Sequence, residues 1–268
     1  MSLNPSVFKA YDIRGIYPTD LDEQGIASIS KGIYSFMSKK LNKRDVSIVV
    51  SRDMRLSSPS LFEAAKRALM ELGATVIDIG ICPTTTLYYA ALKYGYDGGF
   101  QISASHNPKE YNGVKFVMAE NGKILKIAKS NGMDEIKRMA LENDFLPAES
   151  GGNVIEKTTA VHDAVEYAKE LVNLTHIKPF KVVADVANAM GSVYLNEMYT
   201  FLPGTLVRMN FELDGTFPVH QADPLQFKLH EALQKKVVDE KADLGISVDG
   251  DGDRVYFIDE KNSGNTEE

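Results

Sequence analysis

Residues 98–108 read Gly98-Gly99-Phe100-Gln101-Ile102-Ser103-Ala104-Ser105-His106-Asn107-Pro108. The first five residues form an apolar run with the length of a buried strand, and the Asn-Pro pair marks a turn. Because the residue before a proline is pushed out of the α region, we expect Ser105 and His106 to lie on a sharply bent, exposed connection. The stretch therefore predicts a strand that carries a hydroxyl nucleophile and an imidazole at its end.

A serine beside a histidine is weak evidence for catalysis when it stands alone. Most such pairs are ordinary turn residues whose hydroxyl groups bond to nearby backbone. A second stretch, Asp249-Gly250-Asp251-Gly252-Asp253-Arg254, changes the interpretation. It places three carboxylates at alternate positions, and hard divalent cations such as Mg²⁺ prefer oxygen ligands of this kind. A serine, a carboxylate loop and an arginine together indicate phosphoryl transfer.

The aspartate-rich stretch has an alternative interpretation as an EF-hand calcium loop. Its alternating aspartates match the start of that motif, and Glu260 falls at the twelfth position, where the motif requires a bidentate ligand. However, Arg254 stands at the sixth position, where the EF-hand turn requires glycine. Residues 244–248 and 255–258 on either side are typical of strands, whereas an EF-hand requires helices. The EF-hand interpretation is therefore disfavoured.

The two stretches together resemble the α-D-phosphohexomutase family, which contains phosphomannomutases, phosphoglucomutases and phosphoglucosamine mutases. The resemblance runs through nearly the whole chain. The family has four domains, so the resemblance implies that this chain carries domains I and II, that domains III and IV are absent, and that the full-length chain contains them. Four further stretches carry the same resemblance, namely residues 10–15, 52–58, 111–115 and 185–188.

The resemblance implies an isomerase that interconverts hexose 1-phosphates and hexose 6-phosphates. Ser105 would carry a phosphoryl group and exchange it with the sugar through a bisphosphate intermediate, and a hexose 1,6-bisphosphate would act as activator. Mg²⁺ would be the metal, and it would also bind the phosphorylated serine. The expected metal ligands are Ser105, Asp249, Asp251 and Asp253.

Further roles also come from the resemblance. Arg254 would hold a phosphate oxygen, while His106 and Asn107 would orient the loop that carries the serine. Arg254 and Asn107 are the expected substrate- or phosphate-binding residues. Arg14 would contact phosphate, for which a guanidinium is well suited; the alternative is an ordinary surface arginine. Lys115 would lie in the active cleft and carry charge or assist proton transfer; the alternative is a solvated lysine. The expected catalytic residues are Arg14, Ser105, His106 and Lys115.

The apolar pattern predicts alternating strands and helices. Residues 22–41 have the spacing of an amphipathic helix, and strands are expected at 45–50, 75–79, 98–102 and 114–118. The turn at 120–123 is expected to form a hairpin with 124–125. Such alternation indicates an α/β protein, here two βα-alternating domains of the phosphohexomutase type, each with a mixed sheet between helices. Between strand and helix, Arg52 and Arg55 could hold an anion or pair with Asp53, and we favour the structural pair.

Residues 146–153 form the best candidate for a linker, because they combine proline, small residues and a glycine pair. We therefore expect domain I, with the phosphoserine loop, at residues 1–149 and domain II, with the metal-binding loop, at residues 150–268. Domain II should contain strands at 180–184, 205–209 and 243–248, with helices around 162–174, 191–201 and 225–239. The tail at 260–268 is polar and turn-forming.

The composition restricts the class of partner. The 268 residues are 44% hydrophobic and 25% charged, which is ordinary for a globular chain. A net charge of −7 without a basic cluster argues against nucleic acid and membrane partners and leaves a small hexose phosphate as the expected partner. Cys82 is the only cysteine, no stretch is long enough to span a bilayer, and residues 1–5 do not resemble a signal peptide. We therefore expect a cytoplasmic protein.

Two other functions remain open. In the first, the protein is a metal-dependent sugar-phosphate phosphatase, in which water takes the phosphoryl group from the same serine. In the second, it is a non-catalytic fragment that pairs with a separate chain supplying the missing domains. We also expect that this chain is inactive as a mutase on its own, because the resemblance places the sugar-reading elements in the domains it lacks.

Overall fold

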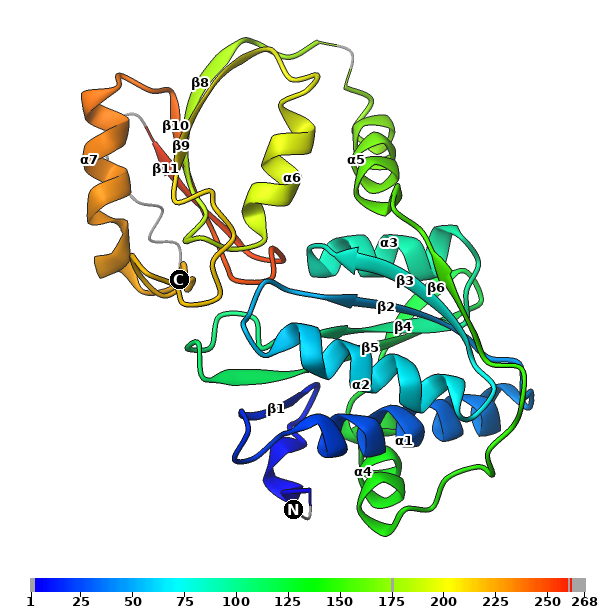
Figure 1. Cartoon of the computed structure of the whole chain (residues 1–268). Coiled ribbons are helices and arrows are strands. Elements are labelled where there is room, and N and C mark those ends of the chain that lie inside the picture. The colour runs from blue at the N-terminus through cyan, green and yellow to red at the C-terminus, as the bar shows by residue number, and fades with distance from the viewer. Residues whose placement is uncertain (1–2, 175, 260, 262–268) are drawn as a thin grey trace. The chain divides into compact units, whose positions relative to one another are not determined.

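The computed structural model describes residues 3–174, 176–259 and 261 (Figure 1). The chain divides into two compact units, of which the first comprises Met1–Ala104 and Glu110–Ala160 and the second comprises Ser105–Lys109 and Val161–Glu268. The short segment 105–109 therefore belongs to the second unit, although it is inserted into the sequence of the first. The expected polar tail lies outside the described residues except for Lys261.

The first unit is built on a seven-stranded sheet in the order β1-β5-β4-β2-β3-β7, with β6 paired to β5. The strands β4, β2, β3 and β7 run parallel, whereas β5 runs antiparallel to β4, β1 and β6. The sheet is therefore mixed, as the sequence predicts. The strands are β1 Ile13–Ile16, β2 Ser47–Arg52, β3 Thr75–Ile81, β4 Gly98–Ile102, β5 Tyr111–Glu120, β6 Lys123–Lys126 and β7 Asn153–Glu156.

Helices cover both faces of this sheet (Figure 1). On one face α1, α2 and α4 share a continuous hydrophobic core with the strands, while α3 packs against β2 and β4 on the other. The α1 helix begins where Asp22 accepts the N–H of Gly25 and ends at Asn42, which has the left-handed conformation typical of a helix C-terminus. The helices are α1 Glu23–Leu41, α2 Ser58–Met70, α3 Thr84–Lys93 and α4 Met133–Glu142, with short 3₁₀ turns at Pro5–Val7 and Lys129–Asn131.

Two strands of the first unit lie outside the predicted set. The β1 strand contains Arg14 in a stretch too polar for a core strand. It lies at the edge of the sheet, where it pairs with β5 and does not need a continuous apolar run. The β7 strand begins at Asn153, the last residue of the predicted linker, and its four residues are all exposed, so they show no apolar alternation to detect. Because β7 pairs with β3, the division between the units falls after Ala160, later than the expected boundary after Glu149.

The second unit contains a four-stranded sheet in the order β11-β10-β8-β9. The strands β10, β8 and β9 run parallel, and β11 runs antiparallel to β10. The strands are β8 Phe180–Asp185, β9 Gly204–Met209, β10 Leu244–Val248 and β11 Val255–Asp259. The helices are α5 Ala160–Leu171, α6 Gly191–Met198 and α7 Glu231–Asp239, with a 3₁₀ turn η3 at Phe227–His230.

The sheet of the second unit has a small core on each face. Val182 and Ala184 of β8 pack with Leu195 of α6 on one face, while Val183 packs with Leu233 of α7 on the other. This division follows from the alternation of side chains along a strand. The strands and helices predicted for this half of the chain are thus present. Among the described residues, no helix combines the length and apolar character needed to cross a bilayer.

Candidate functional site

The serine loop, residues 105–109, connects β4 to β5. Ser105 has φ +54°, which lies in the left-handed region that non-glycine residues rarely adopt. Holding a serine there costs on the order of 1–3 kcal/mol, so the surrounding contacts must stabilise it. The predicted sharp bend is present at this residue.

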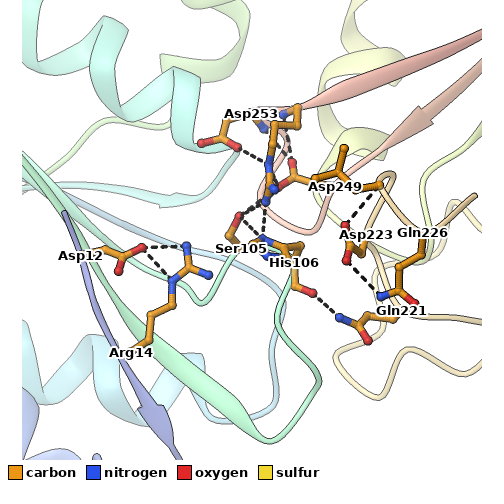
Figure 2. Close-up of polar contacts among 11 residues, drawn as sticks. Asp12, Arg14, Ser105, His106, Gln221, Asp223, Gln226, Asp249 and Asp253 are labelled. Carbon is orange, nitrogen blue, oxygen red and sulfur yellow. Dashed lines mark hydrogen bonds and ion pairs between the residues drawn. The ribbon is translucent and has the colours of Figure 1, made fainter. Parts of the chain in front are cut away.

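Ser105 is buried, with 1% of its surface exposed, whereas Pro108 and Lys109 of the same loop are exposed, so the predicted exposure holds for part of the loop and not for the serine. Its hydroxyl donates to Oδ2 of Asp249 at 2.9 Å and accepts from Nη2 of Arg254 at 2.7 Å (Figure 2). The enclosure depends on a close approach of two backbones, because a Cβ added at Gly250 would lie 2.2 Å from the carbonyl oxygen of Ser105. Only glycine fits at that position without a shift of the chain.

The aspartate loop, residues 249–254, connects β10 to β11. Oδ1 of Asp249 accepts the backbone N–H groups of Asp253 at 3.0 Å and Arg254 at 3.1 Å, so the first aspartate closes its own loop. The strands on both sides confirm the sequence-based argument against an EF-hand, which requires flanking helices. Glu260, the twelfth position of that alternative, lies outside the described residues.

The three aspartates of this loop form a compact set of oxygen donors. One oxygen from each of Asp249, Asp251 and Asp253 lies within 4.8 Å of the others. Asp249 and Asp251 are fully buried, and burial together with the two neighbouring carboxylates raises the pKa of Asp249 to about 7. Buried carboxylates that repel one another are stabilised by a hard divalent cation, which prefers oxygen ligands. The donor set therefore fits a metal ion of that class.

His106 and Arg254 lie beside the serine hydroxyl. Nδ1 of His106 is 3.5 Å from Oγ of Ser105 and contacts Nη2 of Arg254. Nη2 of Arg254 also bonds Oδ2 of Asp249 at 2.6 Å, so the guanidinium bridges the serine and the aspartate loop. Asn107 follows in the serine loop and is half-buried. The second unit thus brings Ser105, His106, Arg254 and the three aspartates together, while the role of Asn107 stays a prediction.

Arg14 and Lys115 belong to the first unit. Arg14 lies on β1, where its guanidinium binds the carboxylate of Asp12 at 2.7 and 2.8 Å (Figure 2). Lys115 lies on β5 opposite Gln101 of β4 and is half-buried. Their roles in contacting phosphate stay predictions.

The loop after β2 is structural, as the sequence analysis favours. Asp53 and Arg55 are fully buried and form an ion pair at 3.1 Å. Asp53 also accepts the hydroxyl of Ser58 at 2.6 Å, and Arg55 donates to the carbonyl oxygen of Tyr111 at 3.0 Å. Arg52 donates to the carbonyl oxygen of Asp53 at 3.2 Å. These bonds tie the start of α2 to the start of β5.

One residue that touches the serine loop is not predicted from the sequence. Nε2 of Gln221 donates to the carbonyl oxygen of His106 at 2.6 Å (Figure 2). Gln221 lies in the long connection between β9 and η3, where neither a motif nor an apolar pattern distinguishes it. Its contact depends on tertiary structure, so no local signal in the sequence predicts it.

Comparison with known proteins finds relatives of both units. The family model for phosphoglucomutase/phosphomannomutase α/β/α domain I matches residues 5–145, and the model for domain II matches residues 163–264. Phosphomannomutase from Vibrio cholerae is 35% identical over 94% of this chain and 55% of its own length. A phosphomannomutase/phosphoglucomutase from Pseudomonas aeruginosa is 34% identical over 96% of this chain and 53% of its own length.

A solved structure supports the same relationship. The crystal structure of a phosphoglucomutase/phosphomannomutase family protein from Burkholderia thailandensis superposes with a TM-score of 0.86 at 28% identity, covering 98% of this chain and 56% of that chain. The chain spans about half the length of the curated relatives it matches. Both family models describe α/β/α domains, which confirms the predicted fold class. This chain therefore belongs to the phosphoglucomutase/phosphomannomutase family.

Proposed function

We propose that the protein interconverts hexose 1-phosphates and hexose 6-phosphates, and that Ser105 carries the phosphoryl group between two positions of the sugar. The observation that supports this most is the environment of one hydroxyl, which lies 2.9 Å from a carboxylate of the aspartate loop and 2.7 Å from a guanidinium. Relatives of this chain are named phosphomannomutase and phosphoglucomutase. The sugar itself is left open, because the relatives include both names.

The site supplies the groups that phosphoryl transfer requires. Arg254 is already bonded to Oγ of Ser105, so its guanidinium would reach the oxygens of a phosphoryl group attached there. The imidazole of His106 lies 3.5 Å from the same Oγ, close enough to orient it or to exchange a proton after a small movement. We propose that Asn107 helps to orient the loop, and that Arg14 and Lys115 contribute positive charge toward the substrate phosphate.

We propose Mg²⁺ as the metal, held by Asp249, Asp251, Asp253 and the phosphorylated Ser105. The three carboxylates provide the charge and the oxygen donors that this ion prefers. A bound Mg²⁺ would offset the negative charge of the phosphoryl group during transfer. A hexose 1,6-bisphosphate would act as activator, because the serine has to carry a phosphoryl group before the first exchange.

The two alternative functions are less well supported. A phosphatase is less well supported, because the relatives of this chain are named as mutases. Pairing with a separate chain is not favoured either, because the relatives are single chains about twice as long. The presence of domains III and IV in a full-length chain and the cytoplasmic location stay predictions.

The test of this proposal is to find which serine accepts phosphate. The purified protein is incubated with glucose 1,6-bisphosphate and Mg²⁺, digested, and mapped by mass spectrometry. Phosphate is expected on Ser105 and not on Ser103, which is equally buried and lies two residues before it. Phosphate on Ser103, or equal labelling of the Ser105→Ala variant, would show that the assignment is wrong.

A further inference from the structure

Residues 220–222, here called the clamp segment, contact both loops of the site within the second unit. The side-chain amide of Gln221 donates to the carbonyl oxygen of His106 at 2.6 Å (Figure 2). The next residue, Ala222, accepts the backbone N–H of Gly250 at 3.2 Å. One short segment thus binds the serine loop through a side chain and the aspartate loop through its backbone.

The clamp segment is itself anchored at the end of β8. Nε2 of His220 lies 3.0 Å from Oδ2 of Asp185, and Nδ1 lies 2.9 Å from the carbonyl oxygen of Gln221. Asp185 is buried, and its other oxygen accepts the backbone N–H of Ala187 at 3.0 Å and the amide of Asn210 at 2.9 Å. Both partners of the imidazole are acceptors, so the ring donates from both nitrogens and is positively charged. The anchor is therefore a hydrogen-bonded ion pair.

The pKa shifts of the two partners agree with this arrangement. The hydrogen bond to Asp185 raises the pKa of His220, although burial opposes the shift. Burial raises the pKa of Asp185, but the bonds from His220 and Asn210 outweigh it and hold that pKa below its usual value. Both shifts favour the charged forms of the two partners.

We propose that Gln221 is a positioning residue for phosphoryl transfer at Ser105, and that the ion pair of His220 and Asp185 holds it in place. This inference rests on the proposed function of Ser105. The backbone of Ser105 has φ +54°, a conformation that a serine does not keep without support. The carbonyl of the following residue, His106, is the group that Gln221 binds, so the amide restrains the bend that sets the direction of the serine hydroxyl.

The role of Gln221 can be separated from the stability of the fold. Gln221 is half-buried and belongs to neither hydrophobic core of the second unit, so removal of its amide leaves the packed strands and helices intact. It is not among the three carboxylates that fit a metal ion. By contrast, Asp185 is buried and bonds three groups, so a substitution there would disturb the turn after β8.

The experiment compares Gln221→Met with Gln226→Met. Methionine keeps the length of the side chain and removes the donor. Gln226 lies in the same connection, but its amide bonds Asp223 at 3.0 Å instead of the serine loop (Figure 2). The rate of Ser105 phosphorylation by glucose 1,6-bisphosphate is followed by mass spectrometry, and Mg²⁺ affinity is measured by calorimetry. We expect Gln221→Met to slow phosphorylation about tenfold or more with unchanged Mg²⁺ affinity, and Gln226→Met to change neither.

Amide hydrogen exchange supplies a readout that does not depend on phosphorylation. Exchange in residues 105–109 should become faster in Gln221→Met and stay unchanged in Gln226→Met and in strand β10. If the wild-type chain takes no phosphate, the proposed function fails, and the exchange still tests the clamp. Wild-type phosphorylation or wild-type exchange in Gln221→Met would overturn the inference while leaving Ser105 assigned. Gln221→Glu, which keeps polarity but cannot donate, should reproduce both effects if the methionine variant does not fold.

Discussion

Substitution of Gly250 by alanine tests the close approach of the two loops. The added Cβ would lie 2.2 Å from the carbonyl oxygen of Ser105, whereas a carbon and an oxygen in contact are about 3.3 Å apart. The aspartate loop and Ser105 must therefore separate by roughly 1 Å. A displacement of this size between reacting groups lowers a rate by about 100-fold, or about 2.7 kcal/mol of transition-state stabilisation.

The assay is the rate at which the Gly250→Ala chain accepts phosphate from glucose 1,6-bisphosphate, with the far-ultraviolet circular dichroism of the variant as a check on folding. Gly25→Ala provides the control, because the nearest atom to its added Cβ is the end of the Leu3 side chain at 3.1 Å, which is able to move. The control should phosphorylate at the wild-type rate. A wild-type rate in Gly250→Ala as well would show that the backbones of Ser105 and Gly250 do not meet at this point.

Four further predictions follow from other parts of the structure. Asp251→Asn should weaken Mg²⁺ binding in calorimetry, because it removes one charge from the donor set; equal affinity would contradict the ligand assignment. Arg55→Met leaves the Asp53 carboxylate buried without its ion-pair partner and should lower the free energy of unfolding in urea by about 3–5 kcal/mol; a loss below about 1 kcal/mol would show that the pair is not buried as described. The pKa of His220 is raised in the folded chain, so protonated His220 stabilises the fold fully below about pH 6.5, and this stabilisation is lost as the pH rises through the pKa of His220 in the folded chain. The urea concentration at the unfolding midpoint should therefore fall with rising pH in the wild type and not in His220→Asn. The purified 268-residue chain should not sustain turnover of glucose 1-phosphate in a coupled assay free of longer homologues. Repeated exchange needs binding energy from the part of the sugar that does not react. Sustained turnover would show that these two units suffice.

The regular elements were predictable where the apolar pattern was strong. The α1 helix has apolar residues at helical spacing, a capping aspartate before it and an asparagine after it, and each of these signals is local. The β7 strand has none of them, because its four residues are exposed and it is held by parallel pairing with β3. The β1 strand was missed for a related reason, since an edge strand needs no continuous apolar run.

The candidate site was predictable as far as its residues form local motifs. The alternating aspartates predict a set of oxygen donors, and the Asn-Pro turn after β4 predicts a bent backbone at Ser105. The burial of that serine could not be read from its own neighbours, because it depends on Gly250, which lies far away in the sequence. The contact of Gln221 with His106 was hidden for the same reason.

The most direct test of the central claim is the fate of the phosphoryl group on Ser105. The protein is labelled at this serine with radioactive phosphate from glucose 1,6-bisphosphate, freed of small molecules, and mixed with glucose 1-phosphate and Mg²⁺. A mutase half-reaction moves the label onto the sugar, so we expect radioactive glucose 1,6-bisphosphate within a single turnover. Label released only as inorganic phosphate, at a rate that glucose 1-phosphate does not change, would contradict the account and identify water as the acceptor.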